Sequence, residues 1–482
     1  MLAVLTRGLL PVLVCASVGL CRLQAQPHPD LARATERYPF IQTDRNFVDN
    51  HTRGLHHFYR RLEMLEAGKI RTVNVVHIGD SHIQADWFSG QVRVELQQRF
   101  GSAGRGLVFP YSVARTNSPT DIHSTSSVSW EVQRNVTSNP KLPTGISGIT
   151  LRTPRPDFGL NLRIDDGPNG LDYSFNKVTL FTGKTDDHFD LLASTEPFTA
   201  TASTAENVYH EVKAGESLGS IAADYGTTTE ALQRLNGIDD LMIYAGQKLL
   251  IRQPAQPQAK ARVFPITLAA RAINDFTTTV YLPETTRELY LRARPTSGQQ
   301  QQATLYGLVL ENYNRSGILY HMIGVNGARY EHYAASSYFA EQLQALQPDL
   351  VILSLGTNET VWGFNEERFF REVDQLVHRI EQYMPHAAII FTTPPDAYRS
   401  GKAVNPAVNR CREVLLNYAF GNDLAAWDLY EVMGGTGSVN DWYGAGLAGK
   451  DRLHFTKSGY ELQGKLLSHA IFLGYDTYRA GR

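Results

Sequence analysis

The sequence predicts an α/β protein with a parallel sheet, interrupted by an antiparallel β-sandwich that itself contains a small βααβ unit. Apolar strands alternate with helical segments over residues 27–112 and 315–482, as in a parallel sheet covered by helices on both faces. Residues 113–314 instead contain short strands in which apolar and polar residues alternate, and this is typical of a sandwich. Segment 207–252 lies between a Thr/Ser/Ala-rich and a Pro/Gln/Ala-rich flank, so it is predicted as a separate unit.

Length and charge restrict the function classes. The chain has 482 residues, which predicts two or three domains. Its hydrophobic content of 42% and charged content of 20% are ordinary for a globular protein. The formal net charge of −2 gives no electrostatic attraction for nucleic acid or for an acidic membrane surface. A nucleic-acid partner is therefore not expected.

The N-terminus has the pattern of a signal peptide over residues 1–26. Arg7 precedes an uncharged apolar run that is too short to span a bilayer, and Ala25 offers a small residue for cleavage. Leu20 stands where lipidation of Cys21 would require a small residue, so no stable membrane anchor is expected after cleavage. We therefore expect an exported protein. Cleavage leaves Cys411 as the only cysteine, and no Cys/His spacing suggests a metal site.

The strands and helices of the α/β part alternate along the chain. The predicted strands are 75–79, 318–323, 349–355, 387–393 and 425–429, and the predicted helices are 38–68, 87–100, 336–346, 366–383, 404–420 and one after 455. The sandwich strands are predicted at 127–132, 148–152, 160–164, 177–181, 278–282 and 288–293. All of these ranges follow from the period of the apolar residues.

The first buried strand ends at Gly79, and Asp80, Ser81 and His82 follow it before a helix begins. In open α/β folds, ligands bind at the carboxyl ends of the strands. A serine at this turn is placed to act as a nucleophile, with its own backbone N–H as an oxyanion donor. The alternative is that Ser81 caps the helix and Asp80 is a turn residue. The stretch alone leaves both open.

Asp451 and His454 lie three residues apart just before the last helix. This spacing allows a carboxylate to hold one imidazole nitrogen while the other faces a serine. The alternative is a cap beside a surface histidine.

Four segments together resemble the blocks of the SGNH (GDSL-like) hydrolases: Gly79-Asp80-Ser81-His82, Gly327, Gly356-Thr357-Asn358, and Asp451 to His454. The resemblance covers roughly residues 40–112 and 315–482 and implies a three-layer α/β fold with no cofactor. It implies that Ser81 is the nucleophile, His454 the general base and Asp451 its orienting carboxylate. It also implies an oxyanion hole made of the Ser81 and Gly327 backbone N–H groups and the Asn358 side chain.

Gly79-Asp80-Ser81-His82-Ile83-Gln84-Ala85-Asp86, residues 320–329 and the inserted sandwich together resemble the peptidoglycan O-acetylesterases of Gram-negative cell envelopes. This resemblance implies an esterase of the periplasm or cell envelope that hydrolyses acetyl esters of N-acetylmuramic acid. His82 and Trp362 are candidates for the pocket; the alternatives are a helix start for His82 and core packing for Trp362. Asp86 is interpreted as a helix cap, with a supporting role near the site as the alternative.

The 207–252 unit resembles a LysM module, through Val-Lys-Ala-Gly-Glu-Ser-Leu, Leu-Asn-Gly and Ala-Gly-Gln-Lys-Leu. LysM modules bind glycans that contain N-acetylglucosamine, such as peptidoglycan. The resemblance implies contacts to such a glycan from Gly215, Glu216, Ser217, Asn236, Gly237 and Ile238. The alternative is that these residues only cap and turn the small fold.

Three other functions remain open from the sequence. An O-acetyltransferase would use the same triad with an acetyl donor. An esterase for another acetylated polysaccharide, such as xylan, would differ in its preferred substrate. A non-catalytic glycan-binding scaffold belongs to a different class, and the complete triad argues against it.

Overall fold

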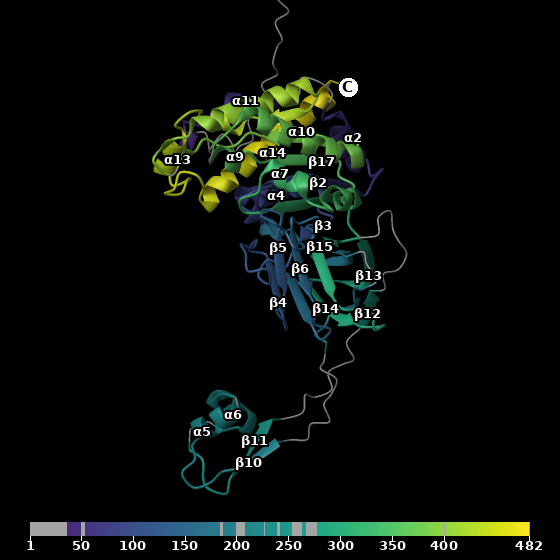
Figure 1. The fold of residues 1–482 in the computed structure, drawn as a ribbon, viewed down its shortest axis with the longest axis vertical. Coiled ribbons are helices and arrows are strands. Elements are labelled where there is room, and N and C mark those ends of the chain that lie inside the picture. The colour runs from purple at the N-terminus through teal and green to yellow at the C-terminus, as the bar shows by residue number, and fades with distance from the viewer. Residues whose placement is uncertain are drawn as a thin grey trace, which may run out of the picture.

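The computed structural model describes residues 36–49, 54–183, 187–198, 208–225, 227–238, 242–252, 263–266, 277–361, 363–399 and 401–481. The predicted signal peptide and Trp362 lie outside these residues. Figure 1 shows an α/β domain, a β-sandwich below it and a small third unit. No helix in the described part of the chain is both long enough and apolar enough to cross a membrane.

The α/β domain is built on a six-stranded sheet. Its order is β1 (Val48–Asp49), β21 (Ala425–Trp427), β18 (Ala388–Thr392), β17 (Leu350–Ser354), β2 (Thr72–Gly79) and β16 (Gly317–Gly324). All neighbours are parallel except β1, which pairs antiparallel with β21 at one edge. Strands β16, β17 and β18 are buried along their whole length, as expected of a sheet covered on both faces.

The register of the central strands aligns three chain turns. Gly79 at the end of β2 pairs with Gly324 of β16 on one side and with Ser354 of β17 on the other. The chain therefore leaves all three strands at one level of the same sheet edge. A side chain at Gly324 has no room, because its Cβ would lie 2.5 Å from the backbone nitrogen of Gln84.

Helices cover both faces of this sheet. One group contains α2 (His56–Glu66), α4 (Phe88–Phe100) and α14 (Lys457–Ala480), and the other contains α7 (Tyr330–Ala335), α8 (Phe339–Leu343), α10 (Glu366–Tyr383) and α11 (Pro406–Gly421). The predicted helix 38–68 is wrong in its first half, where a short 3₁₀ turn (Thr43–Arg45) and edge strand β1 precede α2. The predicted helix 336–346 is split into α8 and a 3₁₀ turn.

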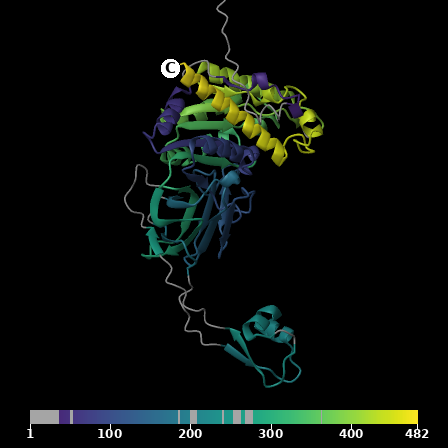
Figure 2. The ribbon, with the colours of Figure 1, turned by 180° about the vertical axis from the view of Figure 1, so that it is seen from behind.

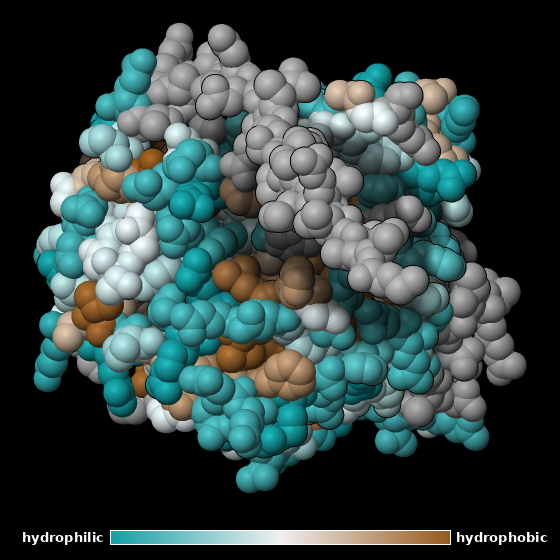
Figure 3. Space-filling view, turned by 90° about the horizontal axis from the view of Figure 1, so that it is seen from above, coloured by the Kyte–Doolittle hydropathy of each residue, from teal (hydrophilic) through white to brown (hydrophobic). Residues whose placement is uncertain are grey.

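The outer surface of these helices is mostly hydrophilic. Figure 3 shows this end of the molecule from above, with small apolar groups among polar ones. Phe370 on α10 and Phe420 on α11 are 46% and 66% exposed. Single apolar side chains of this kind are normal on a protein surface.

The predicted sandwich is confirmed as two antiparallel sheets. One contains β13 (Thr277–Thr286), β8 (Phe175–Thr182), β15 (Ala303–Glu311), β6 (Ile149–Thr153) and β5 (Glu131–Arg134), with β3 (Gly104–Val108) added beside β15. The other contains β12 (Val263–Ile266), β9 (Asp190–Ser194), β14 (Glu288–Arg294), β7 (Gly159–Ile164) and β4 (Ile122–Ser126). One continuous hydrophobic core includes residues of both the sandwich and the α/β domain, for example Leu162 and Ile78.

The small unit has the predicted βααβ order and a core of its own. Its elements are β10 (Val208–Glu211), α5 (Leu218–Asp224), α6 (Thr229–Asn236) and β11 (Lys248–Arg252), and the two strands pair antiparallel. Leu218, Ile221, Leu232 and Leu249 are buried in a cluster separate from the main core. Figures 1 and 2 show the unit apart from the other two.

Candidate active site

The turn after β2 begins with a helix cap, and the cap is Asp80. Its Oδ1 accepts the backbone N–H of His82 over 2.9 Å, while Ser81 is the first residue of the short helix α3 (Ser81–Gln84). The interpretation of Ser81 as the cap is therefore wrong. With the capping role taken by Asp80, the Ser81 hydroxyl remains available for another partner.

That partner is His454. The Ser81 Oγ lies 3.1 Å from His454 Nε2, and His454 Nδ1 lies 2.8 Å from Asp451 Oδ2. The fold thus brings together the three residues predicted as a triad, although 373 residues separate Ser81 from His454. A carboxylate on Nδ1 favours the tautomer in which Nε2 accepts the serine proton.

Asp451 is held in place by its own loop. Its Oδ1 accepts the backbone N–H groups of Leu453 and His454, each over 3.1 Å. Partial burial alone would raise the pKa of Asp451, but the hydrogen bonds from the His454 ring and from these N–H groups keep that pKa below its ordinary value. Asp451 is therefore ionised at neutral pH.

Two backbone N–H groups near Ser81 are without acceptors in the described part of the chain. They belong to Ser81 itself and to Gly327. Gly327 has φ +82°, and a Cβ there would meet no atom within 4 Å, so this glycine borders open space. Both free N–H groups lie in the turns that follow the aligned ends of β2 and β16. Unpaired backbone N–H groups of this kind are suitable donors for an oxyanion.

Gln84 links these two turns, and sequence reasoning missed it. Its Oε1 accepts the Asn326 N–H over 2.7 Å, while its Nε2 donates to Thr116 Oγ1 and to the Asn117 carbonyl. The helix that carries Ser81 therefore also fixes the turn that carries Gly327. The sequence shows only a polar residue at this position, and its three partners are all distant along the chain.

Asn358 lies in the first turn of α9 (Thr357–Val361), beyond the end of β17. Its Nδ2 donates to Asp80 Oδ2 and to the Ala328 carbonyl, both over 3.0 Å. A side-chain amide carries two hydrogens, so both are engaged. Asn358 is next to the turn of Gly327, but it reaches an oxyanion only by releasing or sharing one of these acceptors.

His82 forms a layer behind His454. Its side chain is buried, its ring centroid lies 5.4 Å from that of His454, and its Nδ1 lies 2.8 Å from the hydroxyl of Tyr460. Burial lowers the pKa of His82 to about 3, so the ring is neutral. A small pocket of about 20 Å³ beside it is lined by Ser354, Thr392 and Gln463, among others. Trp362, the other pocket candidate, lies outside the described residues.

Two buried carboxyl groups stand beneath the site. Burial raises the pKa of Asp80 to about 7 and that of Glu359 to about 8. Glu359 Oε1 accepts the N–H of Tyr330 over 2.9 Å, and its other oxygen has no hydrogen-bond partner within the described residues. Glu359 was not predicted from the sequence. Among the described residues, including this site, no group of three or more His, Cys, Asp or Glu side chains is placed to hold a metal ion.

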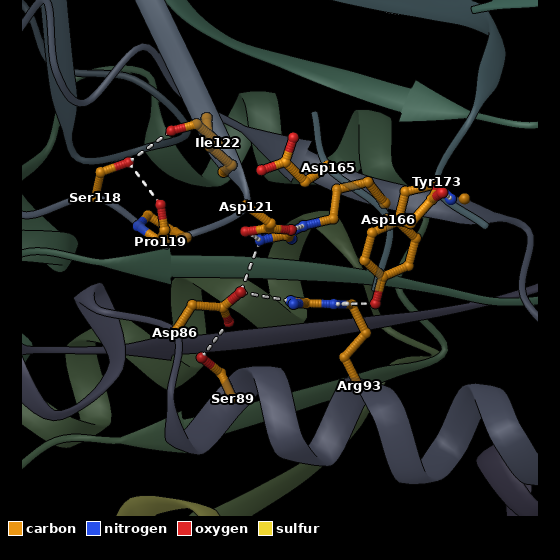
Figure 4. A network of polar contacts seen from close by, with 12 residues as sticks. Asp86, Ser89, Arg93, Ser118, Pro119, Asp121, Ile122, Asp165, Asp166 and Tyr173 are labelled. Atoms are coloured by element: carbon orange, nitrogen blue, oxygen red, sulfur yellow. Dashed lines mark hydrogen bonds and ion pairs between the residues drawn. The ribbon is translucent and has the colours of Figure 1, made fainter. Parts of the chain in front are cut away.

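Asp86 does not cap α4 with its side chain, contrary to the sequence interpretation. Its carboxylate instead accepts from Ser89 over 2.7 Å and pairs with Arg93 and Arg105, each over 2.7 Å. Figure 4 shows the contacts of Asp86 with Ser89 and Arg93. The residue that precedes α4 is Trp87, which makes no side-chain cap.

Several of the glycan candidates in the small unit have structural partners. Asn236 donates to the carbonyls of Leu232 and Leu250 and accepts the N–H of Leu250. Ser217 caps α5, and Glu216 contacts His210 over 2.7 Å. Gly215 and Gly237 have φ of +93° and +63°, and Ile238 packs on the core of the unit.

Comparisons with known proteins agree with this architecture. Residues 285–462 match the GDSL-like Lipase/Acylhydrolase family, and residues 210–252 match the LysM domain. The first range contains Gly327, Asn358, Asp451 and His454, whereas Ser81 precedes it. A solved structure of a peptidoglycan O-acetylesterase is similar in fold, with a TM-score of 0.60 at 18% identity, over 87% of this chain and 96% of that one.

Two curated relatives match over shorter stretches. An N-acetylmuramoyl-L-alanine amidase of Staphylococcus epidermidis is 44% identical over 63 residues, which are 13% of this chain and 19% of that protein. The amidase of the same name from Staphylococcus aureus is 51% identical over 43 residues, 9% of this chain and 13% of that protein. The chain thus spans less than a fifth of the length of these relatives. It contains a GDSL-like lipase/acylhydrolase domain of the SGNH fold, interrupted by a β-sandwich, and a LysM domain nested in that sandwich.

Proposed function

We propose that this protein is a serine esterase that removes O-acetyl groups from N-acetylmuramic acid in peptidoglycan, and that its LysM domain holds the polymer. The observation that carries the proposal is the Ser81–His454–Asp451 geometry, with distances of 3.1 and 2.8 Å. The fold shared with a peptidoglycan O-acetylesterase and the LysM match support the substrate class. An exported protein of the periplasm or cell envelope would meet this substrate.

In the first half-reaction, Ser81 Oγ attacks the acetyl carbonyl carbon while His454 Nε2 takes the serine proton. Asp451 stabilises the imidazolium that forms. The tetrahedral intermediate collapses, the bond from the carbonyl carbon to the sugar oxygen breaks, and His454 returns its proton to that oxygen. The products are the free sugar hydroxyl and an acetyl ester on Ser81.

Water completes the cycle. His454 takes a proton from a water molecule while the water oxygen attacks the carbonyl carbon of the acetyl ester. The second tetrahedral intermediate collapses as the bond from this carbon to Ser81 Oγ breaks and His454 returns its proton to Oγ. Acetic acid leaves and ionises to acetate, and the resting enzyme is restored. In both half-reactions the negative charge develops on the acetyl oxygen, where the N–H groups of Ser81 and Gly327 and the Asn358 amide would stabilise it.

The test is acetate release from O-acetylated peptidoglycan by the full chain. Ser81→Ala should abolish release, and Ser297→Ala, at an exposed serine of a sandwich loop, should leave it intact as the matched control. Turnover that persists in Ser81→Ala would contradict the proposal. Adding a glycan that lacks O-acetyl groups tests for transfer: O-acetyl groups that appear on this acceptor, with no free acetate, would indicate an O-acetyltransferase instead.

A further inference from the structure

A large cleft lies where the GDSL-like domain meets the sandwich, and we call it the junction cleft. Helices α4 and α14 form one wall, and the sandwich segments 119–121 and 166–173 form the other. Its volume is about 740 Å³, within the range of about 300–1,000 Å³ that is common for ligand sites. It is separate from the small pocket beside His82.

A buried network of charges sets the distance between the two walls (Figure 4). Arg105 on β3 pairs with Asp86, which follows the nucleophile helix, and with Asp121 of the sandwich. Arg93 on α4 also pairs with Asp86 and donates to the hydroxyl of Tyr173 in the sandwich over 3.1 Å. Buried ion pairs add little net stability, because desolvation offsets their attraction, but they constrain geometry. The cleft is therefore formed before any ligand binds.

Some residues that line the cleft directly follow the segments that carry Ser81 and His454. Its lining includes Ala85, Asp86 and Trp87, directly after α3, and Lys457, three residues after His454. The Trp87 ring lies 6.1 Å from Tyr460, whose hydroxyl contacts His82 behind His454. The segments that carry Ser81 and His454 therefore continue directly into the helical wall of the cleft.

The lining suits a saccharide chain. Gln98 and Lys465 on the helical wall and Thr120 and Asn169 on the sandwich wall are exposed, and none has a side-chain partner within the described residues. They offer donors and acceptors from both sides, as hydroxyl and acetamido groups require. Trp87 adds an aromatic face, and acidic side chains such as Glu95 and Glu461 stand among the basic ones, which disfavours a polyanion.

We propose that the junction cleft binds the glycan strand beside the residue whose acetyl group is removed. This inference rests on the proposed function and adds a second glycan site, distinct from the LysM domain. The sandwich then contributes one wall of the polymer site. Because both walls are already fixed, binding needs little ordering of the protein.

The first test compares two substrates in variants of the full chain. Lys465→Glu changes the helical wall, and Asn169→Gly changes the sandwich wall while tolerating the local φ of +57°. Each should lower the ratio of kcat/KM for soluble O-acetylated strands to kcat/KM for a small aryl acetate by about fivefold to tenfold, as loss of one or two hydrogen bonds predicts. Lys69→Glu, at an exposed lysine before β2 on the opposite sheet edge, is the matched control and should keep the ratio.

The second test measures binding without turnover. Ser81→Ala is titrated calorimetrically with short oligomers of N-acetylglucosamine and N-acetylmuramic acid that lack O-acetyl groups. Two sites per chain are expected, one in the LysM domain and one in the cleft, and the added pair Lys465→Glu and Asn169→Gly should leave one. An unchanged ratio together with an unchanged stoichiometry would overturn the cleft proposal and leave the esterase standing. A stoichiometry that falls from two to one, with no acetate release by the unmutated chain, would support the cleft and contradict the proposed function.

Discussion

Asn358 donates its side-chain amide to the Asp80 carboxylate over 3.0 Å and so joins the turn after β17 to the turn after β2. The same nitrogen donates to the Ala328 carbonyl, next to Gly327. One side chain therefore connects the three turns that leave the aligned strand ends. This position allows Asn358 both to hold the site together and, by exchanging the Ala328 acceptor, to stabilise an oxyanion.

Replacing Asn358 separates these two roles. If its amide stabilises the oxyanion, Asn358→Ala should lower kcat by about 10²–10³ with little change in KM. Asn409→Ala, on the exposed side of α11 where Asn409 donates to Glu413 over 2.9 Å, is the control. A loss of only a few-fold in kcat, together with a lower Tm, would restrict Asn358 to the structural role.

Asp451→Asn should impair catalysis without unfolding the protein, because the Asp451 side chain is 52% exposed. An amide cannot act as the anionic acceptor for the Nδ1 proton of His454, so the ring adopts the wrong tautomer and loses the stabilisation of its charged form. We expect a drop in kcat of about 10²–10⁴, in line with other serine triads. The measurement is kcat on a small aryl acetate, with circular dichroism to check the fold. Asp157→Asn, in an exposed pair with Arg155, should have wild-type kcat; a wild-type kcat for Asp451→Asn as well would remove Asp451 from the triad.

Tyr460→Phe tests the layer behind His454. The change removes the hydroxyl that contacts His82 Nδ1 over 2.8 Å, and an unpaired buried nitrogen costs about 1–3 kcal/mol. Because the rings of His82 and His454 are in contact, kcat should also fall several-fold, and its pH profile should shift. Tyr313→Phe, at a half-exposed tyrosine of the sandwich, is the control. A lower Tm with unchanged kcat and pH profile would show that His82 only packs.

The buried carboxyl of Glu359 should make stability depend on pH. Its pKa is about 8 in the folded protein against an ordinary 4.5, so the stability gained by its neutral form is complete below about 4.5 and is lost as the pH rises through 8. Between pH 7 and 9 this loss is about 1.4 kcal/mol, or roughly 2 °C in Tm for a unit of this size. The buried His82 does not add to this loss of stability, because the pKa of a histidine in the unfolded chain lies below the range from pH 7 to 9.

Glu359→Gln keeps an acceptor for Tyr330 and cannot ionise, so it should reduce the fall in Tm between pH 7 and 9. Some decline should remain, because the pKa of Asp80 is also raised, to about 7. Glu413→Gln, at an exposed position of α11, should decline as the wild type does. An identical decline in Glu359→Gln would contradict a neutral Glu359.

Asn236→Ala should unfold the LysM domain rather than remove a single ligand contact. Its amide makes three hydrogen bonds to the backbone of Leu232 and Leu250, worth about 1 kcal/mol each. A domain this small has about 3–5 kcal/mol of stability from its core. Limited proteolysis within 207–252 should therefore accelerate as glycan binding is lost. Lost binding with unchanged proteolysis would instead indicate that Asn236 contacts the glycan. Asn314→Ala, in a loop of the sandwich domain, should leave both the proteolysis and the binding unchanged.

The sequence by itself determined the order of strands and helices, the nature of the insertion and the LysM domain, because these depend on local period and local motifs. It also showed that Ser81 follows a strand end and that Asp451 and His454 precede the last helix, and the resemblance of these motifs to the SGNH hydrolases implied that the three act as a group. The predicted bounds of the elements were wrong where tertiary contacts dominate. Residues 48–49 form a strand only because they pair with β21.

Only the tertiary structure decided that Asp80 rather than Ser81 caps α3, that both hydrogens of the Asn358 amide are engaged, and that Gln84 ties two turns together. Only the tertiary structure also showed that His82 and Tyr460 form a neutral layer and that the sandwich forms one wall of the junction cleft. Each of these depends on contacts between residues far apart in the chain, which neither the hydrophobic period nor the spacing of a motif encodes. Burial also sets the pKa of Asp80 and Glu359, and a carboxyl group in a sequence gives no sign of how deeply it will lie.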